Sequence, residues 1–330
     1  MHPDLALRTL GGSVVSATDE SFAAKENLIV PGPPTFDPTT FGHRGKVYDG
    51  WETRRRRTPG HDEAVVRLGA PGVVRRIVVD TTWFTGNFPP EAAVDGSADG
   101  STWFALLPLS PLKGDSENAF DVRCDRRVTH VRLRIVPDGG VARLRVHGEA
   151  LPDPALLDAL GTVDLVAIEN GGHVRDVSNR FYSSPHNLLL PGPARSMGEG
   201  WETARRRDAG NDWVELGLGT EGRIALAEID TSYFLYNAPG SAVLRGRCVD
   251  ASSGDGRGGD EKGGEGAWQD LLDTPLQPDT RHRFVLADRP AVSEVRLDIF
   301  PDGGLSRVRL WGTPTERGRE SLQTRWRSAR

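Results

Sequence analysis

Short runs in which hydrophobic and polar residues alternate are the main pattern along this chain. Residues 131–135 read Val-Arg-Leu-Arg-Ile, and residues 295–299 read Val-Arg-Leu-Asp-Ile. This alternation puts apolar side chains on one face of a strand and charged ones on the other, as in an antiparallel sheet with one face in water. Residues 142–147 repeat the pattern after the turn sequence Pro-Asp-Gly-Gly, so a β-hairpin is predicted over 131–147.

One segment carries the signals of a helix. Asp153 suits the N-cap and Pro154 suits the first helical position. The apolar-rich segment 155–160 follows, and Gly161 closes it. A short helix is therefore predicted between two β-rich regions.

The two β-rich regions are copies of one another. Residues 50–53, Gly-Trp-Glu-Thr, return at 200–203, and the Pro-Asp-Gly-Gly turn returns at 301–304. The copies run over 13–148 (repeat one) and 172–312 (repeat two). Each copy is long enough to bury a core of its own.

Changes in the offset between the copies locate two insertions. Repeat one carries about ten extra residues around Phe36 to Arg44. Repeat two carries a glycine-rich stretch from Ser252 to Gly266, which is typical of a flexible surface loop.

The pattern predicts an all-β fold of two tandem jelly-roll β-sandwich domains joined by a short helical linker. The first domain is expected over residues 1–150, the linker over 151–171 and the second domain over 172–313. The polar, basic tail 314–330 is expected to be disordered.

Composition narrows the class of protein. The 330 residues carry 41 Lys and Arg against 46 Asp and Glu, a net charge of −5, which argues against a general nucleic-acid binder. Two cysteines exclude a disulfide-rich scaffold and leave a single bridge open. No apolar run approaches the roughly 18 residues of a membrane span, and the first residues lack the pattern of a signal peptide. A cytoplasmic protein is expected.

Polar residues recur in both copies, although a sandwich core needs none of them. Buried ion pairs and Asx-turns would explain the recurrence as well as a functional site would. An arginine beside Glu52 could clamp a carboxylate, and His61 could act as a general acid or base. The candidate catalytic residues are Glu52, His61, Asp62 and Asp80, and the candidate substrate-binding residues are Arg54, Arg55, Thr81, Asn87 and Asp138.

The sequence motifs of several common enzyme classes are missing from this chain. The chain has no His-Glu-x-x-His, no Cys-x-x-Cys, no phosphate-binding loop, no Gly-x-Gly-x-x-Gly after a strand and no Gly-x-Ser-x-Gly. No metal ligand set is predicted, and no cofactor is expected, although a weak requirement for a divalent metal ion stays open.

The chain resembles the allantoicase family. The resemblance covers both copies from about Gly11 to Gly312. It is carried by blocks in repeat one that largely recur in repeat two: Asn27-Leu28, Gly45-Lys46, residues 49–55, Gly60-His61-Asp62, Asp80-Thr81, residues 84–87 and Pro137-Asp138-Gly139-Gly140 leading into Arg143.

The resemblance implies galactose-binding-like jelly rolls and hydrolysis of allantoate to ureidoglycolate and urea in purine catabolism. It also makes a homo-oligomer plausible by analogy. On this hypothesis Arg54 or Arg55 binds the substrate carboxylate, and Glu52 or Asp80 binds the ureido N–H groups. His61, oriented by Asp62, would carry the proton.

Two departures from the family pattern are visible, one in each repeat. The pattern reads Gly-His-Asp-Trp, whereas repeat one has Glu63 and only repeat two keeps the aromatic residue, Trp213. Repeat two has Asn211 in place of His61, which favours repeat one for the chemistry. The alternatives are a catalytically degenerate paralogue and a tandem jelly-roll protein that binds a small ligand or carbohydrate.

Overall fold

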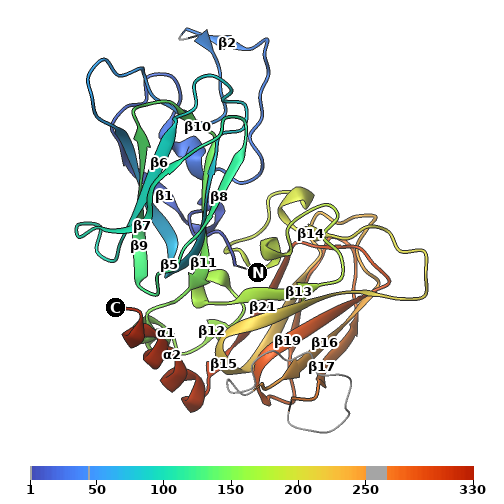
Figure 1. Ribbon diagram of the computed structural model, residues 1–330. Helices are drawn as coiled ribbons and strands as arrows, with labels where there is room; N and C mark the ends of the chain where they lie inside the picture. Colours follow the sequence, from blue (N-terminus) through green and yellow to red (C-terminus); the bar gives the residue numbers. More distant parts are fainter. Residues whose placement is uncertain (1, 44, 250–265) are drawn as a thin grey trace. The chain divides into compact units, whose positions relative to one another are not determined.

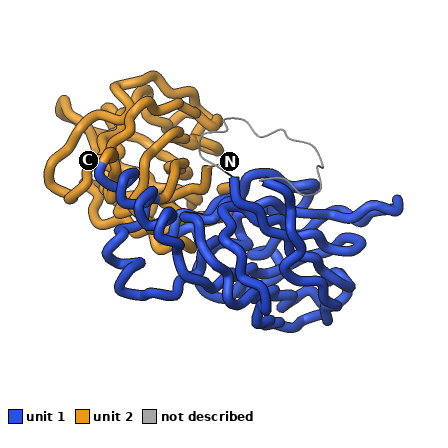
Figure 2. The backbone as a smooth tube through the Cα atoms, turned by 90° about the horizontal axis from the view of Figure 1, so that it is seen from below, with its two compact units in different colours: residues 1, 151–327 blue, residues 2–150, 328–330 orange. Residues whose placement is uncertain are grey.

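The computed structural model describes residues 2–43, 45–249 and 266–330 (Figure 1). The chain divides into two compact units, residues 2–150 with 328–330 and residues 151–327 (Figure 2). Both units are β-sandwiches of the same plan, so the prediction of an all-β tandem fold is confirmed. The units are described separately below.

A single long strand organises the first unit. The first half of β5 (Asp62–Asp80) pairs with β1 (Ser13–Ala17) and with β9 (Arg127–Val136), and its second half pairs with β11 (Arg143–Ala150). One strand therefore belongs to both layers of the sandwich. The remaining strands are β6 (Glu91–Ser97) and β7 (Phe104–Pro111) beside β9, and β8 (Glu117–Asp121) beside β5.

The second unit repeats this plan around another 19-residue strand, β15 (Asp212–Asp230). Its partners are β13 (His173–Val177), β18 (Arg281–Val285), β19 (Ala291–Phe300) and β21 (Arg307–Pro314). Farther out lie β16 (Ser241–Arg247) and β17 (Gln269–Pro275) beside β19, and β12 (Val163–Asp164) beside β21.

The predicted hairpin over 131–147 is wrong in its pairing. Both β9 and β11 form, but β9 pairs with the first half of β5 and β11 with its second half. The Pro-Asp-Gly-Gly segment therefore crosses from one layer to the other instead of joining neighbouring strands. Alternation in the sequence identifies strands, whereas partner choice depends on residues far away along the chain.

The buried faces follow the alternation at most positions, although Asp298, at a polar position of β19, is only 2% exposed. Val131, Leu133 and Ile135 are fully buried. Arg143 stands at a position predicted to face water, yet only 1% of it is exposed. A charged group is stable there only because the protein supplies hydrogen-bond partners for it, which are described with the site.

The linker helix forms as predicted. The helix α1 (Pro154–Leu160) begins after Asp153, whose side chain accepts a hydrogen bond from the Ala155 N–H at 2.9 Å. The chain leaves the helix at Gly161 with a φ of 71°, a left-handed conformation that glycine adopts without strain.

The prediction of a disordered tail is wrong. Residues Glu316–Ser328 form the helix α2, in which Leu322 is buried and Gly318 approaches the backbone of Glu221 closely. Thr315 donates a hydrogen bond to the Glu221 carboxylate at 2.6 Å at the start of this helix. Two apolar side chains among many charges were too weak a sequence signal, because contacts to residues of β15 that are distant in the chain, such as Glu221, hold this helix.

The insertion in repeat one forms a small hairpin, β2 (Phe41–Gly42) with β3 (Gly45–Lys46) (Figure 1). The glycine-rich insertion of repeat two lies outside the described residues, apart from Gly266. Both cysteines are free, which answers the question of a bridge. Among the described residues no helix has the length and apolar character needed to cross a membrane.

Candidate active site

A two-residue strand positions Glu52. The strand β4 (Trp51–Glu52) pairs with β10 (Gly140–Val141), the strand that follows the Pro-Asp-Gly-Gly segment. Trp51 is fully buried, and its indole N–H donates to the Asp19 carbonyl at 2.8 Å. Because neighbouring side chains of a strand point to opposite faces, Glu52 points away from that core and is half-buried.

Glu52 and Asn87 form a hydrogen-bonded pair. The Asn87 side-chain N–H donates to Glu52 Oε1 at 2.7 Å. The Asn87 carbonyl accepts from the Gly140 N–H at 2.8 Å, so the loop that carries Asn87 is fastened to β10. Burial raises the pKa of the Glu52 carboxyl above its usual value, and the hydrogen bond from Asn87 offsets part of that rise. Such a carboxyl is suited to exchanging protons.

The other carboxylate oxygen of Glu52 is open. No hydrogen bond to Glu52 Oε2 is present within the described part of the chain, and neither Glu52 Oε2 nor Asn87 Oδ1 belongs to the buried, unpartnered atoms. Both are acceptors, so together they offer a place for a ligand with several N–H groups.

A set of backbone hydrogen bonds holds the chain after Glu52. The Thr53 N–H donates to the Gly139 carbonyl at 3.1 Å, and the Gly139 N–H donates to the Thr53 hydroxyl at 3.2 Å. Asp138 accepts from the Arg56 N–H at 2.8 Å. The Arg56 guanidinium then donates to Asp62 at 2.9 Å. Residues 52–56 are therefore fixed at both ends.

A close contact between Gly140 and Phe84 fixes the position of β10. A Cβ atom at Gly140 would lie 2.0 Å from the Phe84 ring, which is fully buried. Only glycine lets β10 lie against Phe84 at this distance. The position of β10, and with it that of β4 and Glu52, depends on this contact.

Arg143 fixes the chain before Glu52. Its guanidinium donates to the Asp49 carbonyl at 3.0 Å and to the Asp49 carboxylate at 2.6 Å. These contacts, with a third to the Ala142 carbonyl at 2.8 Å, explain why a cation is stable in a buried position. Asp49 directly precedes Gly50-Trp51-Glu52, so Arg143 helps to set where Glu52 lies.

The arginines after Glu52 differ in their partners. Arg54 pairs with Asp19 at 3.0 Å. Arg55 is exposed and pairs with no carboxylate among the described residues. Arg55 lies three residues after Glu52 in the sequence, which makes it a candidate to contact the same small ligand. A cation without a partner can bind an anionic group of that ligand.

Comparison with known proteins identifies the family. The model of the allantoicase repeat matches residues 3–151 and again residues 163–315. The chain belongs to the allantoicase family.

Individual relatives agree along nearly the whole chain. A protein of Nocardia farcinica named probable allantoicase is 59% identical over 324 residues, which cover 94% of each chain. A Streptomyces coelicolor protein of the same name is 48% identical over 98% of this chain and 89% of its own. The crystal structure of allantoicase from Saccharomyces cerevisiae superposes with a TM-score of 0.79 at 31% identity, covering 94% of this chain and 92% of that one.

Within this allantoicase repeat the predicted partnership of His61 and Asp62 does not form. Asp62 is buried and accepts from Arg56 and from the Thr18 hydroxyl, both at 2.9 Å. His61 is exposed, and its Nε2 lies 3.6 Å from Glu63. Asp62 therefore does not orient the imidazole: its Oδ1 accepts from Arg56 and Thr18, and the imidazole lies against Glu63.

Three other predicted residues make structural hydrogen bonds. Asp80 accepts from the Thr82 N–H at 2.8 Å, and Thr81 donates to the Lys113 carbonyl at 2.6 Å. Both side chains are buried. Asp138 binds the Arg56 backbone, as described above. These interactions are the structural alternative that the sequence left open, whereas Glu52, Asn87 and Arg55 keep groups available for a ligand.

The departure at Glu63 lies away from the Glu52–Asn87 pair. Glu63 Oε2 is 3.9 Å from Arg132, on the outer face of β5 and β9. At the corresponding place in repeat two, the Arg296 guanidinium lies 4.3 Å from the centre of the Trp213 ring. Arg132, the counterpart of Arg296, pairs with Glu63 and also lies 4.7 Å from the centre of the Trp103 ring, so repeat one keeps a cation–π contact with another aromatic residue.

Sequence reasoning missed the residues that build the frame. Arg56, Thr53 and Arg143 fix the site, yet none was selected. Their recurrence as Arg206, Thr203 and Arg307 was a usable signal. Within the described residues, no cluster of three or more His, Cys, Asp or Glu side chains is arranged to hold a metal ion.

Proposed function

We propose that this member of the allantoicase family hydrolyses allantoate to ureidoglycolate and urea at the Glu52–Asn87 pair. Family membership over nearly the whole chain supports the reaction. The half-buried Glu52, with one oxygen held by Asn87 and one open, is the observation that supports the site.

The proposed chemistry needs one proton donor and one water. Allantoate carries a carboxylate and two ureido groups on its central carbon. The Glu52 carboxyl gives its proton to the nitrogen of one ureido group as the bond from that nitrogen to the central carbon breaks, which releases urea. A water molecule then forms the new carbon–oxygen bond and returns a proton to the Glu52 carboxylate.

Binding is assigned to two further side chains. Asn87 Oδ1 accepts a ureido N–H, and the Arg55 guanidinium binds the substrate carboxylate. Arg54 is the weaker candidate for that carboxylate because Asp19 already neutralises it.

His61 is not assigned the proton, since it lies against Glu63. Asn211, its counterpart in repeat two, donates to Asp298 of β19 at 2.9 Å.

The first experiment measures urea release from allantoate by the purified protein, with and without a chelator. The proposal includes no cofactor, so turnover should survive chelation. Loss of turnover that a divalent ion restores would show a metal requirement and contradict a purely side-chain mechanism. No turnover under either condition would favour the degenerate paralogue or a binding protein.

Variants then test the residues. Arg55→Ala should raise the KM of the site in repeat one at least tenfold with a smaller change in the kcat of that site, because it removes binding of a charge that stays on the substrate throughout. Arg54→Ala should change KM less than threefold, and His61→Asn should leave kcat within twofold. Equal effects of the two arginine variants would contradict the assignment of Arg55, and a hundredfold loss in His61→Asn would return the proton to His61.

The same proposal includes a cytoplasmic homo-oligomer with no nucleic-acid or membrane partner. Its support is the family resemblance and the acidic net charge of −5. Cell fractionation and size-exclusion chromatography with light scattering test location and subunit number directly.

A further inference from the structure

Repeat two builds the same pair of side chains as repeat one. Its strand β14 (Trp201–Glu202) pairs with β20 (Gly304–Leu305), as β4 pairs with β10. The Asn237 side-chain N–H donates to Glu202 Oε1 at 2.6 Å, against 2.7 Å for the pair in repeat one. Glu202 is half-buried, and its second oxygen has no hydrogen bond in the described part of the chain.

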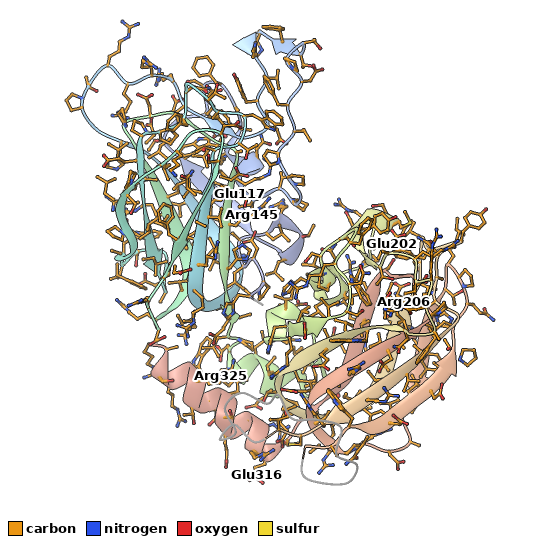
Figure 3. All side chains as sticks on the ribbon, turned by 45° about the vertical axis from the view of Figure 1, so that its right-hand side comes forward. Glu117, Arg145, Glu202, Arg206, Glu316 and Arg325 are labelled. Atoms are coloured by element: carbon orange, nitrogen blue, oxygen red, sulfur yellow. The ribbon has the colours of Figure 1, made fainter. Side chains whose placement is uncertain are left out.

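The hydrogen bonds that hold the chain after Glu52 also recur after Glu202. The Thr203 N–H donates to the Gly303 carbonyl at 3.1 Å, and Asp302 accepts from the Arg206 N–H at 2.8 Å. The Arg206 guanidinium donates to the buried Asp212 at 3.0 Å. Figure 3 labels Glu202 and Arg206, which lie near the same loop-bearing end of the second sandwich.

The position before the pair is fixed by a buried arginine here too. Arg307 donates to the Glu199 carbonyl at 2.7 Å, as Arg143 donates to the carbonyl of Asp49. Glu199 directly precedes Gly200-Trp201-Glu202. The contact to the carbonyl before Gly-Trp-Glu is thus common to both repeats, whereas the Glu199 carboxylate pairs with Arg195 instead of the buried arginine.

The differences between the repeats lie outside this arrangement. Ala204 replaces Arg54, whose charge Asp19 neutralises in repeat one. Asn211 replaces His61 and donates to Asp298 on the outer face of β19. Arg205, the counterpart of Arg55, is exposed and has no carboxylate partner among the described residues. Each group assigned to the substrate in repeat one therefore has its counterpart in repeat two.

The duplicated groups are costly for stability alone. Burying half of a carboxylate while one oxygen stays open loses hydration without a full return in hydrogen bonds. A sandwich core gains nothing from an exposed arginine beside it. Retention of both in two copies points to a ligand common to both.

We propose that repeat two holds a second active site, formed by Glu202, Asn237 and Arg205, for the same class of ligand. That class is a small carboxylate anion with ureido N–H groups. This inference rests on the proposed function, since it transfers the chemistry of Glu52 to Glu202. Each chain then carries two sites that act independently.

The test uses Glu52→Gln, Glu202→Gln and the double variant in the full chain. Glutamine keeps the size of the side chain and an oxygen for the asparagine N–H, and removes only the exchangeable proton. Glu117→Gln and Glu316→Gln, at exposed positions marked in Figure 3, are matched controls in the two units. Urea release is measured over a range of allantoate concentrations, and circular dichroism checks folding of each variant.

Two independent sites predict that each single variant keeps a substantial share of kcat, near half for equal sites, with KM within about twofold. The double variant should lose about a hundredfold or more. Wild-type kcat in Glu202→Gln, or complete loss in either single variant, would overturn the second site. Wild-type kcat in the double variant would instead overturn the proposed function of the pair itself.

Binding gives a second readout that does not depend on turnover. The folded double variant should bind two allantoate molecules per chain in isothermal titration calorimetry, and adding Arg205→Ala should abolish or weaken one of them. A stoichiometry of one before Arg205→Ala is introduced would contradict the proposal.

Discussion

At the scale of single residues, the two carboxylates of the candidate region differ in how many hydrogen bonds they accept from side chains. Asp62 is buried and receives hydrogen bonds from Arg56 and Thr18, whereas Glu52 receives a single hydrogen bond from Asn87. The first carboxylate is occupied by structural partners, whereas burial raises the pKa of the second and one of its oxygens stays open. The half-satisfied carboxylate is therefore the better candidate for chemistry.

The raised pKa of Glu52 predicts a pH-dependent stability. Because burial raises its folded pKa above the ordinary value of 4.5, the folded state binds this proton more tightly than the unfolded state does. The stabilisation is full below about pH 4.5 and is lost as the pH rises through the folded pKa. Relative to wild type, Glu52→Gln should therefore gain free energy of unfolding as the pH is raised from about 4 to about 8. Urea unfolding at both pH values measures this difference. A fall in the free energy of unfolding of Glu52→Gln relative to wild type over that range would contradict the raised pKa.

At the scale of elements, short strands and close contacts decide where the functional side chains lie. The two-residue strand β4 is held by β10 on one side, and β10 is held against Phe84 because position 140 has no side chain. Arg143 secures the residue before the strand. Such short pairings have little stability of their own and depend on tertiary contacts.

Gly140→Ala tests this dependence. Its Cβ would lie 2.0 Å from the Phe84 ring, so β10 or Phe84 must move, and the free energy of unfolding should fall by about 1–3 kcal/mol. The contribution of repeat one to urea release should fall with it. Gly86→Ala is the matched control, because a Cβ there meets nothing within 4 Å and should change stability by less than about 0.5 kcal/mol. Equal melting temperatures for the two variants would refute the role of the close contact.

At the scale of the whole molecule, duplication keeps contacts and exchanges the groups that make them. Asp95 pairs with Arg134 at 3.1 Å in repeat one, and Arg245 pairs with Asp298 at 2.7 Å in repeat two, with the charges swapped between the strands. What has been kept is the ion pair, not its residues. The Glu–Asn pair, by contrast, keeps both residue types in both copies.

The C-terminal helix α2 belongs to the fold of the second unit and makes a prediction at this scale. Leu322 is its buried apolar side chain, so Leu322→Ala should lower the free energy of unfolding by about 2–5 kcal/mol. Ser321→Ala, one position away and exposed, should change it by less than about 0.5 kcal/mol. Thermal unfolding followed by circular dichroism compares them. A Leu322→Ala variant as stable as Ser321→Ala would mean that the helix contributes nothing.

The sequence by itself determined the tandem repeat, the all-β class, the linker helix and the family. These depend on local alternation, capping residues and the comparison of one segment with another, all of which are written along the chain. It also placed Glu52, Asn87 and Arg55 among the candidates, because polar residues recurred where a core does not need them.

Only the tertiary structure decided which candidate side chains are held by structural partners and which keep groups open. The separation of β9 from β11, the capture of Asp62 by Arg56 and the burial of Arg143 all depend on partners distant in the chain. A side chain's chemistry is set by the groups that surround it, and spacing in the sequence does not reveal them. The same reason explains α2, which is held by contacts to Glu221, a residue distant in the chain.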